Sequence, residues 1–281
     1  MNETEYLNTL TKKIAGSIAQ DNPILSLEGQ DVYAVISAFL SEAVPEIGQD
    51  LIDSRIDWYV GAVLQNARAL DPSFLQKNPY IKRVRFNTIK SGKYLLTNQS
   101  YEKGEILQYA FPLMEDGVYI PRLAYFTKKT NFPTIYEKNV PWMSVIPSEI
   151  TSMEQPIAHA RGNMLVLGLG LGYYAYRIGQ KKEVSKITIV EKSSDVIALF
   201  EDNILCQFEK EIQDKITLVC MDAHAYMKQV QDNTYDGIFA DLWEGAADGH
   251  AWYEELHAYE AELSHTRFDY WIEEYLHDKM Q

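Results

Sequence analysis

The second half of the chain carries four short apolar runs, each leading into a glycine or an acidic residue. The first, residues 164–167, is apolar at every position, and the others occupy residues 186–190, 215–220 and 235–240. Strands that are apolar on both faces are typical of a parallel sheet covered by helices. Residues 193–208 and 223–230 provide the crossover helices that parallel strands require. The pattern therefore predicts an α/β fold with a doubly wound sheet.

The first half of the chain follows two other patterns. Between residues 3 and 70, apolar residues recur at helical spacing in stretches that prolines separate, so we expect residues 1–83 to form a helical accessory region. Residues 84–140 change to short runs rich in Tyr, Ile, Phe and Leu, which predict a small antiparallel β segment. Within it, Asp116-Gly117 stands between apolar residues and predicts a hairpin.

The third predicted region, residues 141–281, holds the sheet and a short helical end. Residues 147–160 predict a helix that is kinked at Pro156. After Asp241, residues 251–263 and 267–277 read as helices, with residues 268–272 as an alternative strand. A sheet with so few final strands is expected to be truncated, or completed by the N-terminal part or by a partner chain. A homo-oligomer is therefore one expectation, because proteins cover free sheet edges.

The net charge of −14 argues against nucleic acid as a partner, because such binding depends on Lys and Arg neutralising phosphates. One stretch within residues 73–100 is an exception, with no acidic residue and six basic ones: Lys77, Lys82, Arg83, Arg85, Lys90 and Lys93. It is either a solvated face or a contact surface for an anion or RNA. Residues 241–281 hold eleven acidic residues against Arg267 and Lys279, which form a solvated face or attract a cationic substrate.

Cysteine usage and hydropathy predict a cytoplasmic protein with no membrane contact. Cys206 and Cys220 are too few for a disulfide scaffold, so we expect reduced, buried thiols. Residues 1–13 lack an apolar signal region. No apolar run approaches the roughly 18 residues of a membrane span.

Three glycines follow the first apolar run at every second position: Gly168, Gly170 and Gly172. Glycine permits positive φ and lets a ligand approach the backbone, although a strand-to-helix turn without a ligand has the same pattern. Glu191 lies 19 residues after Gly172, at the tip of the second run, where doubly wound sheets place the acceptor for ribose hydroxyls. Asp222 and Asp241 follow the third and fourth runs. All four tips fall where open α/β sheets bind ligands.

The segments GLGLG, IVEKS, CMDAHAY and YDGIFADLW resemble, in order and spacing, the motifs of class I S-adenosylmethionine-dependent methyltransferases, in the branch similar to spermidine synthases. The resemblance covers residues 141–243. It implies a Rossmann-like class I methyltransferase fold and S-adenosylmethionine as the cofactor. The turn reads GxGxG, with Tyr173 where nicotinamide and flavin enzymes have a third glycine or alanine, which argues against a dehydrogenase.

The resemblance also implies which residues hold the cofactor. They are Gly168, Leu169, Gly170, Gly172, Glu191, Lys192, Asp222, Ala223 and Asp241. Glu191 would accept the ribose hydroxyls. Asp222 would accept from the adenine amine, with the Ala223 amide at the ring nitrogen. For both acids the alternative is a helix N-terminal residue that complements the helix dipole.

Asp241 is the first candidate for a catalytic residue, and Glu244 is the second. Asp241 ends the strand that the resemblance places nearest the transferred group, where it acts electrostatically or as a base. His224, His250 and Tyr173 are candidate contacts, with packing as the commoner role. No histidine has the ligand spacing of a metal site, so we expect no metal.

Three functions remain open. Methyl transfer to an unknown small-molecule or protein acceptor ranks first. Aminopropyl transfer, as in spermidine synthases, ranks second: that family carries two aspartates three apart and then proline, whereas here Glu244 is the second acid and the proline is absent. Its turn also usually starts GGG, against Gly-Leu-Gly here. The third is a non-catalytic protein that keeps the nucleotide pocket, which the short C-terminal region favours.

Overall fold

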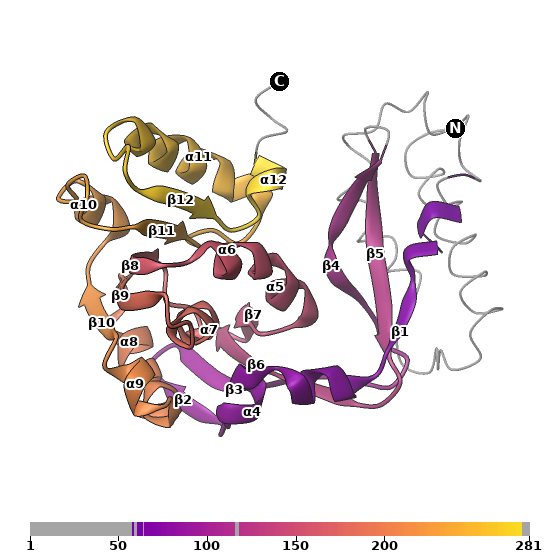
Figure 1. Cartoon of the computed structure of the whole chain (residues 1–281). Coiled ribbons are helices and arrows are strands. Elements are labelled where there is room, and N and C mark those ends of the chain that lie inside the picture. The colour runs from indigo at the N-terminus through magenta and orange to yellow at the C-terminus, as the bar shows by residue number, and fades with distance from the viewer. Residues whose placement is uncertain (1–57, 59–60, 64, 116–117, 277–281) are drawn as a thin grey trace. The chain divides into compact units, whose positions relative to one another are not determined.

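The computed structural model describes residues 58, 61–63, 65–115 and 118–276. The helices predicted before residue 58 lie outside these residues. The chain divides into two compact units, which are considered separately. Figure 1 shows the elements with their labels.

The smaller unit contains a three-stranded sheet of order β1-β5-β4. Its strands are β1 (Arg68–Leu70), β4 (Ile106–Glu115) and β5 (Val118–Phe126). The predicted hairpin is confirmed, since Glu115 pairs with Val118 in the antiparallel register of β4 and β5. β1 is a strand where the periodicity predicted helix, because it pairs in parallel with β5 through Arg68–Leu70. Pairing with a distant strand overrides local propensity here.

The larger unit begins with the 3-10 helix η2 (Pro72–Lys77), which starts in the smaller unit, and helix α4 (Pro79–Arg83). A four-stranded sheet of order β2-β3-β6-β7 follows. Its strands are β2 (Ile89–Ser91), β3 (Tyr94–Tyr101), β6 (Thr130–Glu137) and β7 (Val140–Ser144). The pairs β2–β3 and β6–β7 are antiparallel, as predicted for this part of the chain.

The sheet predicted from the apolar runs forms the rest of this unit, with order β10-β9-β8-β11-β12. Its strands are β8 (Gly162–Leu167), β9 (Val184–Glu191), β10 (Ile216–Cys220), β11 (Gly237–Ala240) and β12 (Arg267–Tyr270). All neighbouring pairs are parallel. The predicted doubly wound, Rossmann-like α/β fold is therefore confirmed. The strand order reverses at β8, and such a switch point opens a ligand crevice at the carboxyl ends of the strands.

Helices connect the successive parallel strands (Figure 1). They are α7 (Tyr173–Gly179), α8 (Ser194–Asn203), η3 (Leu205–Gln207), α9 (Lys210–Gln213), α10 (Ala223–Met227), α11 (Ala246–His257) and η4 (Ala258–Ala261), with α12 (Glu273–Leu276) after the last strand. Both predicted crossover segments contain a helix, α8 and α10. The end of the chain differs from its main prediction, because the predicted helix at residues 267–277 is β12 followed by α12. β12 pairs in parallel with β11, and within the described residues no further strand extends the sheet.

The helix predicted before the sheet is two helices, α5 (Pro147–Ser152) and α6 (Glu154–His159). The break lies at Met153 rather than at Pro156. Pro156 falls in the first turn of α6, where a helix needs no backbone N–H, so the proline is accommodated.

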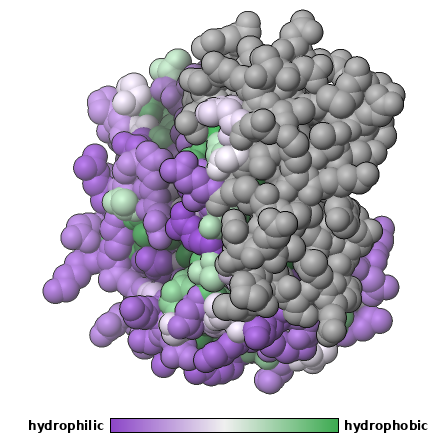
Figure 2. Space-filling view, turned by 90° about the vertical axis from the view of Figure 1, so that its right-hand side faces the viewer, coloured by the Kyte–Doolittle hydropathy of each residue, from purple (hydrophilic) through white to green (hydrophobic). Residues whose placement is uncertain are grey.

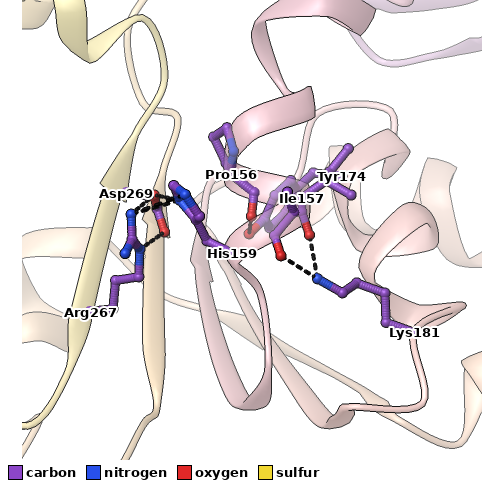
Figure 3. A network of polar contacts seen from close by, with 8 residues as sticks. Pro156, Ile157, His159, Tyr174, Lys181, Arg267 and Asp269 are labelled. Carbon is purple, nitrogen blue, oxygen red and sulfur yellow. Dashed lines mark hydrogen bonds and ion pairs between the residues drawn. The ribbon is translucent and has the colours of Figure 1, made fainter.

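The carboxyl end of α6 forms polar contacts with β12 and with Lys181, which lies just after α7 (Figure 3). His159 Nδ1 lies 2.6 Å from the buried Asp269 Oδ1, and Arg267 lies within hydrogen-bond distance of both side chains. Lys181 Nζ donates to two carbonyls in the last turn of α6, at 2.6 and 2.8 Å. These bonds satisfy C-terminal carbonyls that the helix itself leaves without donors.

The central strand of the parallel sheet is apolar, whereas the described surface is mainly polar. The residues from Met164 to Leu167 are all buried, which fits a strand with two covered faces. On the face shown in Figure 2, the described surface is mainly hydrophilic, with apolar residues in small patches.

The prediction of buried thiols is wrong, because Cys206 and Cys220 are both exposed. Among the described residues, no helix is long and apolar enough to cross a membrane.

Candidate functional site

The glycine turn connects β8 to α7 at the carboxyl edge of the sheet. Gly168, Gly170 and Gly172 have φ of 97°, 54° and 70°, in the left-handed region that favours glycine. Two of them are also required by packing. A Cβ on Gly168 would lie 2.1 Å from the Asp241 carbonyl oxygen, and one on Gly172 would lie 2.2 Å from Phe200 Cε2.

Gly170 differs from its two neighbours, because a Cβ there would make only ordinary van der Waals contact. The nearest atom to a Cβ at this position would be Met143 Sδ, at 3.6 Å. Among the described residues, no atom stands so close to Gly170 that a side chain there would clash. Of the three glycines, Gly170 is the one that packing does not require.

Glu191 ends β9 and lies beside this turn, as the sequence predicted. The residue is 6% exposed. Its Oε1 accepts from the Ser193 amide at 2.8 Å, and its Oε2 accepts from the Leu169 amide at 3.4 Å. The carboxylate thus joins the strand tip to the turn, and each oxygen keeps a lone pair for a further donor. Its neighbour Lys192 is exposed.

Asp222 caps α10, and its Oδ1 accepts from the Ala225 amide at 3.1 Å. This is the helix-terminal role that was the alternative to adenine recognition. The residue is exposed, and Oδ2 has no protein partner in the described part of the chain, so the two roles are compatible. Ala223 is buried at the start of the helix. The Met221 amide donates to the Glu191 carbonyl at 3.1 Å, which keeps the tips of β9 and β10 adjacent.

Asp241 lies immediately after β11 and next to the glycine turn. Its amide donates to the Leu167 carbonyl at 2.9 Å, so the tips of β8 and β11 are joined. Among the described residues, no side chain or amide donates to its carboxyl group. The side chain is only partly open to solvent, and burial raises the pKa of Asp241 to about 7. Asp241 is therefore a carboxyl group at the edge of the sheet that is largely shielded from water and has no hydrogen-bond donor among the described residues.

The segment after Asp241 is held by hydrogen bonds that its backbone amides donate. Asp248 in α11 accepts from the Glu244 and Gly245 amides, both at 2.9 Å. The Glu244 side chain is exposed and has no partner within the described residues. Trp243, which no sequence pattern indicated, is 6% exposed, and its indole nitrogen is buried with no hydrogen-bond partner among the described residues. Asp241 is therefore partly buried beside the glycine turn, whereas Glu244 is exposed at the surface.

The three other candidate contact residues, His224, Tyr173 and His250, differ in their surroundings. His224 stacks on Trp252 with ring centroids 4.0 Å apart, and its Nδ1 lies 2.5 Å from Glu255 Oε1, which connects α10 to α11. Tyr173 packs in the first turn of α7 and is buried. His250 lies within α11, and its Nδ1 is buried with no hydrogen-bond partner in the part of the chain that the structure describes. The packing role favoured for these residues holds for His224 and Tyr173.

The sequence analysis also missed residues ahead of the sheet that reach the turn. Tyr80 in α4 donates its hydroxyl proton to the Leu171 carbonyl at 2.5 Å. Met143 in β7 faces Gly170. No local pattern marks these positions, because contacts across 91 residues leave no trace in periodicity.

Of the six basic residues, Arg83, Arg85 and Lys93 have partners within the larger unit. Arg83 is paired with Glu209 at 3.3 Å and Lys93 with Glu137 at 2.7 Å, while Arg85 bonds to the Ile81 carbonyl. All six are exposed. In the described part of the chain, no group of three His, Cys, Asp or Glu side chains is arranged to hold a metal ion.

One family profile and several solved structures are similar to parts of this chain. Residues 148–262, less than half of the chain, match the family profile described as the spermine/spermidine synthase domain. No curated protein sequence matches the chain. The spermidine synthase from Thermotoga maritima is 15% identical over 44% of this chain and 48% of its own, with a TM-score of 0.34.

Two further solved structures are similar over a part of the chain. A spermidine synthase in complex with the transition state analogue AdoDATO is 15% identical over 41% of this chain and 43% of its own, with a TM-score of 0.34. A bacterial methyltransferase domain is 18% identical over 33% and 46%, with a TM-score of 0.25. The chain spans less than half the length of each of these three structures. The strand order of the parallel sheet identifies the fold. In residues 148–262 the chain thus contains a spermine/spermidine synthase-like domain built on a Rossmann-like sheet.

Proposed function

We propose that the protein is a transferase that binds an S-adenosyl sulfonium nucleoside and passes an alkyl group from it to an amine. The observation that carries the proposal is Asp241. A carboxyl group that burial keeps half-protonated near neutral pH, with no protein partner among the described residues, suits a cationic ligand. The backbone of Asp241 lies against Gly168 of the glycine turn, at the carboxyl ends of the strands, where doubly wound sheets bind nucleotides.

The remaining residues fit such a ligand. The backbone at Gly170 has the space for close approach. Glu191 can still accept ribose hydroxyls, because its backbone bonds use one lone pair of each oxygen. The free oxygen of Asp222 is available to the adenine amine. These three roles, with those of Lys192 and Ala223 beside them, extend the family resemblance and belong to the proposal.

The chemistry that a bound sulfonium supplies is a carbon whose bond to sulfur breaks, with the electron pair left on a neutral thioether, as the amine lone pair forms the new carbon–nitrogen bond. Asp241 has two tasks in this step. Its ionised form attracts the cationic ligand, and its pKa of about 7 allows it to take the proton that the amine loses. The side chains around it restrict water, which strengthens both effects.

We place aminopropyl transfer first among the possible reactions. The spermine/spermidine synthase profile matches the segment that contains Glu191, Asp222 and Asp241. In this reaction the nucleoside is the decarboxylated form, and the acceptor is a polyamine. The acidic side chains after β11 favour such a polycation, and the exposed Glu244 would hold its far amine.

Methyl transfer from S-adenosylmethionine to a small-molecule or protein acceptor is the second candidate. The turn has leucine between its first two glycines rather than a third glycine, and Asp241-Leu-Trp-Glu244 lacks the second aspartate and the proline of spermidine synthases. These departures concern residues at the crevice itself. They favour an acceptor other than the polyamines of that family.

Product analysis separates the two reactions. The full chain is incubated with S-adenosylmethionine or its decarboxylated form, with putrescine and with a mixture of amines, and nucleoside products are separated by chromatography. Methylthioadenosine from the decarboxylated form indicates aminopropyl transfer, and adenosylhomocysteine indicates methyl transfer. Asp241→Asn should reduce either product at least about a hundredfold, whereas Glu262→Gln, at an exposed site away from the crevice, should not. Absence of both products, with no binding of either nucleoside, refutes the proposal.

A further inference from the structure

Tyr80 holds one peptide group of the glycine turn from outside the parallel sheet. The residue is fully buried, and its hydroxyl donates to the Leu171 carbonyl at 2.5 Å. The amide of the same peptide group, on Gly172, donates to the Leu169 carbonyl at 3.0 Å. The peptide between Leu171 and Gly172 is therefore held at both of its polar ends.

This peptide group would otherwise be free to rotate. Leu171 stands between two glycines with φ of 54° and 70°. A peptide next to glycine can turn over at low cost, because glycine accepts both signs of φ. The Gly172 carbonyl also accepts from the Tyr176 amide, the first bond of α7. The orientation of the peptide therefore sets the end of the turn and the start of the helix.

The ring of Tyr80 is itself held in place. It packs edge-on against Tyr173, Tyr176 and Phe208, with ring centroids 5.4, 5.7 and 6.3 Å away. Burial raises the pKa of the Tyr80 hydroxyl well above its usual value, so it remains a donor at all ordinary pH. A rigid ring with a protonated hydroxyl is a fixed hydrogen-bond donor.

A second bond joins α4 to the first turn of α7. Asn78 caps α4 through Oδ1, which accepts from the Tyr80 and Ile81 amides. Its Nδ2 donates to the Tyr173 hydroxyl oxygen at 3.0 Å, and Arg177 donates to the same oxygen at 2.6 Å. The side-chain amide of Asn78 therefore bonds to α4 through its oxygen and to α7 through its nitrogen.

We infer that α4, through Tyr80, is a positioning element for the glycine turn, so that the nucleotide site depends on a helix ahead of the parallel sheet. The inference rests on the proposed function for its meaning, but the positioning itself is testable without a ligand. Tyr80 touches no reacting atom in this account. Its role is to keep the Leu171 peptide in the one orientation that leaves the Gly170 backbone open to the crevice.

Hydrogen exchange tests the inference, with a matched pair of variants in the full chain. Tyr80→Phe removes the hydroxyl that reaches the turn. Tyr176→Phe removes a hydroxyl from the same aromatic cluster whose contacts, to Glu209 and Gln180, are at 3.5 and 3.4 Å and do not involve the turn. We expect the peptide that covers residues 168–176 to exchange about tenfold faster in Tyr80→Phe alone.

Two outcomes would overturn the inference. Equal exchange in the two variants would show that the hydroxyl does not hold the turn. Faster exchange spread over all strands of the sheet would show a general packing role. Titration with S-adenosylmethionine adds a separate arm, in which Tyr80→Phe should bind about five- to tenfold more weakly than Tyr176→Phe. If the unaltered protein does not bind this nucleoside, the proposed function fails, while the exchange result still decides the positioning role.

Discussion

At the scale of single residues, Glu191 and Asp241 show how two carboxyl groups differ at the tips of the strands on either side of β8. Glu191 is buried and accepts from two backbone amides. Asp241 has no donor among the described residues, and burial raises its pKa to about 7. The first carboxyl group is held by the surrounding backbone, whereas the second is the one that we propose to face a ligand.

The raised pKa of Asp241 makes stability depend on pH. Unfolded aspartate titrates at about 3.9, so between this pH and about 7 the folded protein binds more protons than the unfolded chain. Its contribution to stability is therefore present at low pH and is lost as pH rises to 7. Asp241→Asn removes the cost of the buried charge and should raise the free energy of unfolding at pH 8 by about 2 to 4 kcal/mol. Urea unfolding at pH 5 and pH 8 measures this, and an equal effect at both pH values would contradict it.

Glu191→Gln should lower the free energy of unfolding, which is the opposite of the effect expected for Asp241→Asn. The amide must direct its NH₂ group at either the Leu169 or the Ser193 amide, so one backbone donor loses its acceptor. We expect a loss of about 1 to 3 kcal/mol in unfolding free energy and weaker nucleoside binding. The exposed Glu183→Gln is the control. Unchanged stability and unchanged affinity for adenosine would exclude both roles of Glu191.

At the scale of elements, the glycine turn combines packing and binding. Gly172→Ala places a Cβ 2.2 Å from Phe200 and should destabilise the fold by about 2 to 4 kcal/mol. Gly170→Ala meets no atom closer than 3.6 Å, so it should cost only about 1 kcal/mol, from its φ of 54°. Yet the added methyl group fills the open side of the turn. Gly170→Ala should therefore fold and lose nucleoside binding, as thermal unfolding with and without ligand can show. Retained binding in Gly170→Ala would contradict the assignment.

Strands and acidic tips were predictable from sequence because they follow local patterns. Short apolar runs predicted β8, β9, β10 and β11, and the ends of two of these runs marked Glu191 and Asp241 as strand tips. The break of the helix at Met153 was not predictable from Pro156 alone, since the cost of proline depends on where the helix begins. β12 was ambiguous because its four residues follow neither period clearly.

The contacts from α4 and β7 to the turn could not be predicted. Tyr80 and Leu171 are 91 residues apart, and neither lies in a motif that specifies the other. The protonation of Asp241 could not be predicted either, because its pKa depends on how completely the surrounding segments exclude water. Sequence located the carboxyl group, and the three-dimensional packing determined its proton affinity.

At the scale of the whole molecule, the net charge of −14 bears on the choice of ligand. An acidic protein attracts cations over distances that salt limits to about 10 Å at 0.1 M. We expect the affinity for a cationic nucleoside to fall severalfold between 0.05 and 0.5 M salt. The affinity for neutral adenosine should change little, so it serves as the control. Equal salt dependence of the two ligands would show that the charge of the protein has no part in binding.

The most direct test of the account is the proton balance of binding, measured by titration calorimetry at pH 6.5 in buffers of different ionisation enthalpy. At this pH Asp241 is largely protonated in the free protein, and a sulfonium bound beside it lowers its pKa. Decarboxylated S-adenosylmethionine should therefore release between about half a proton and one proton on binding to the unaltered chain, and none from this site on binding to Asp241→Asn. Binding with the same proton balance in both proteins would show that Asp241 does not face the ligand, and the central claim would be wrong.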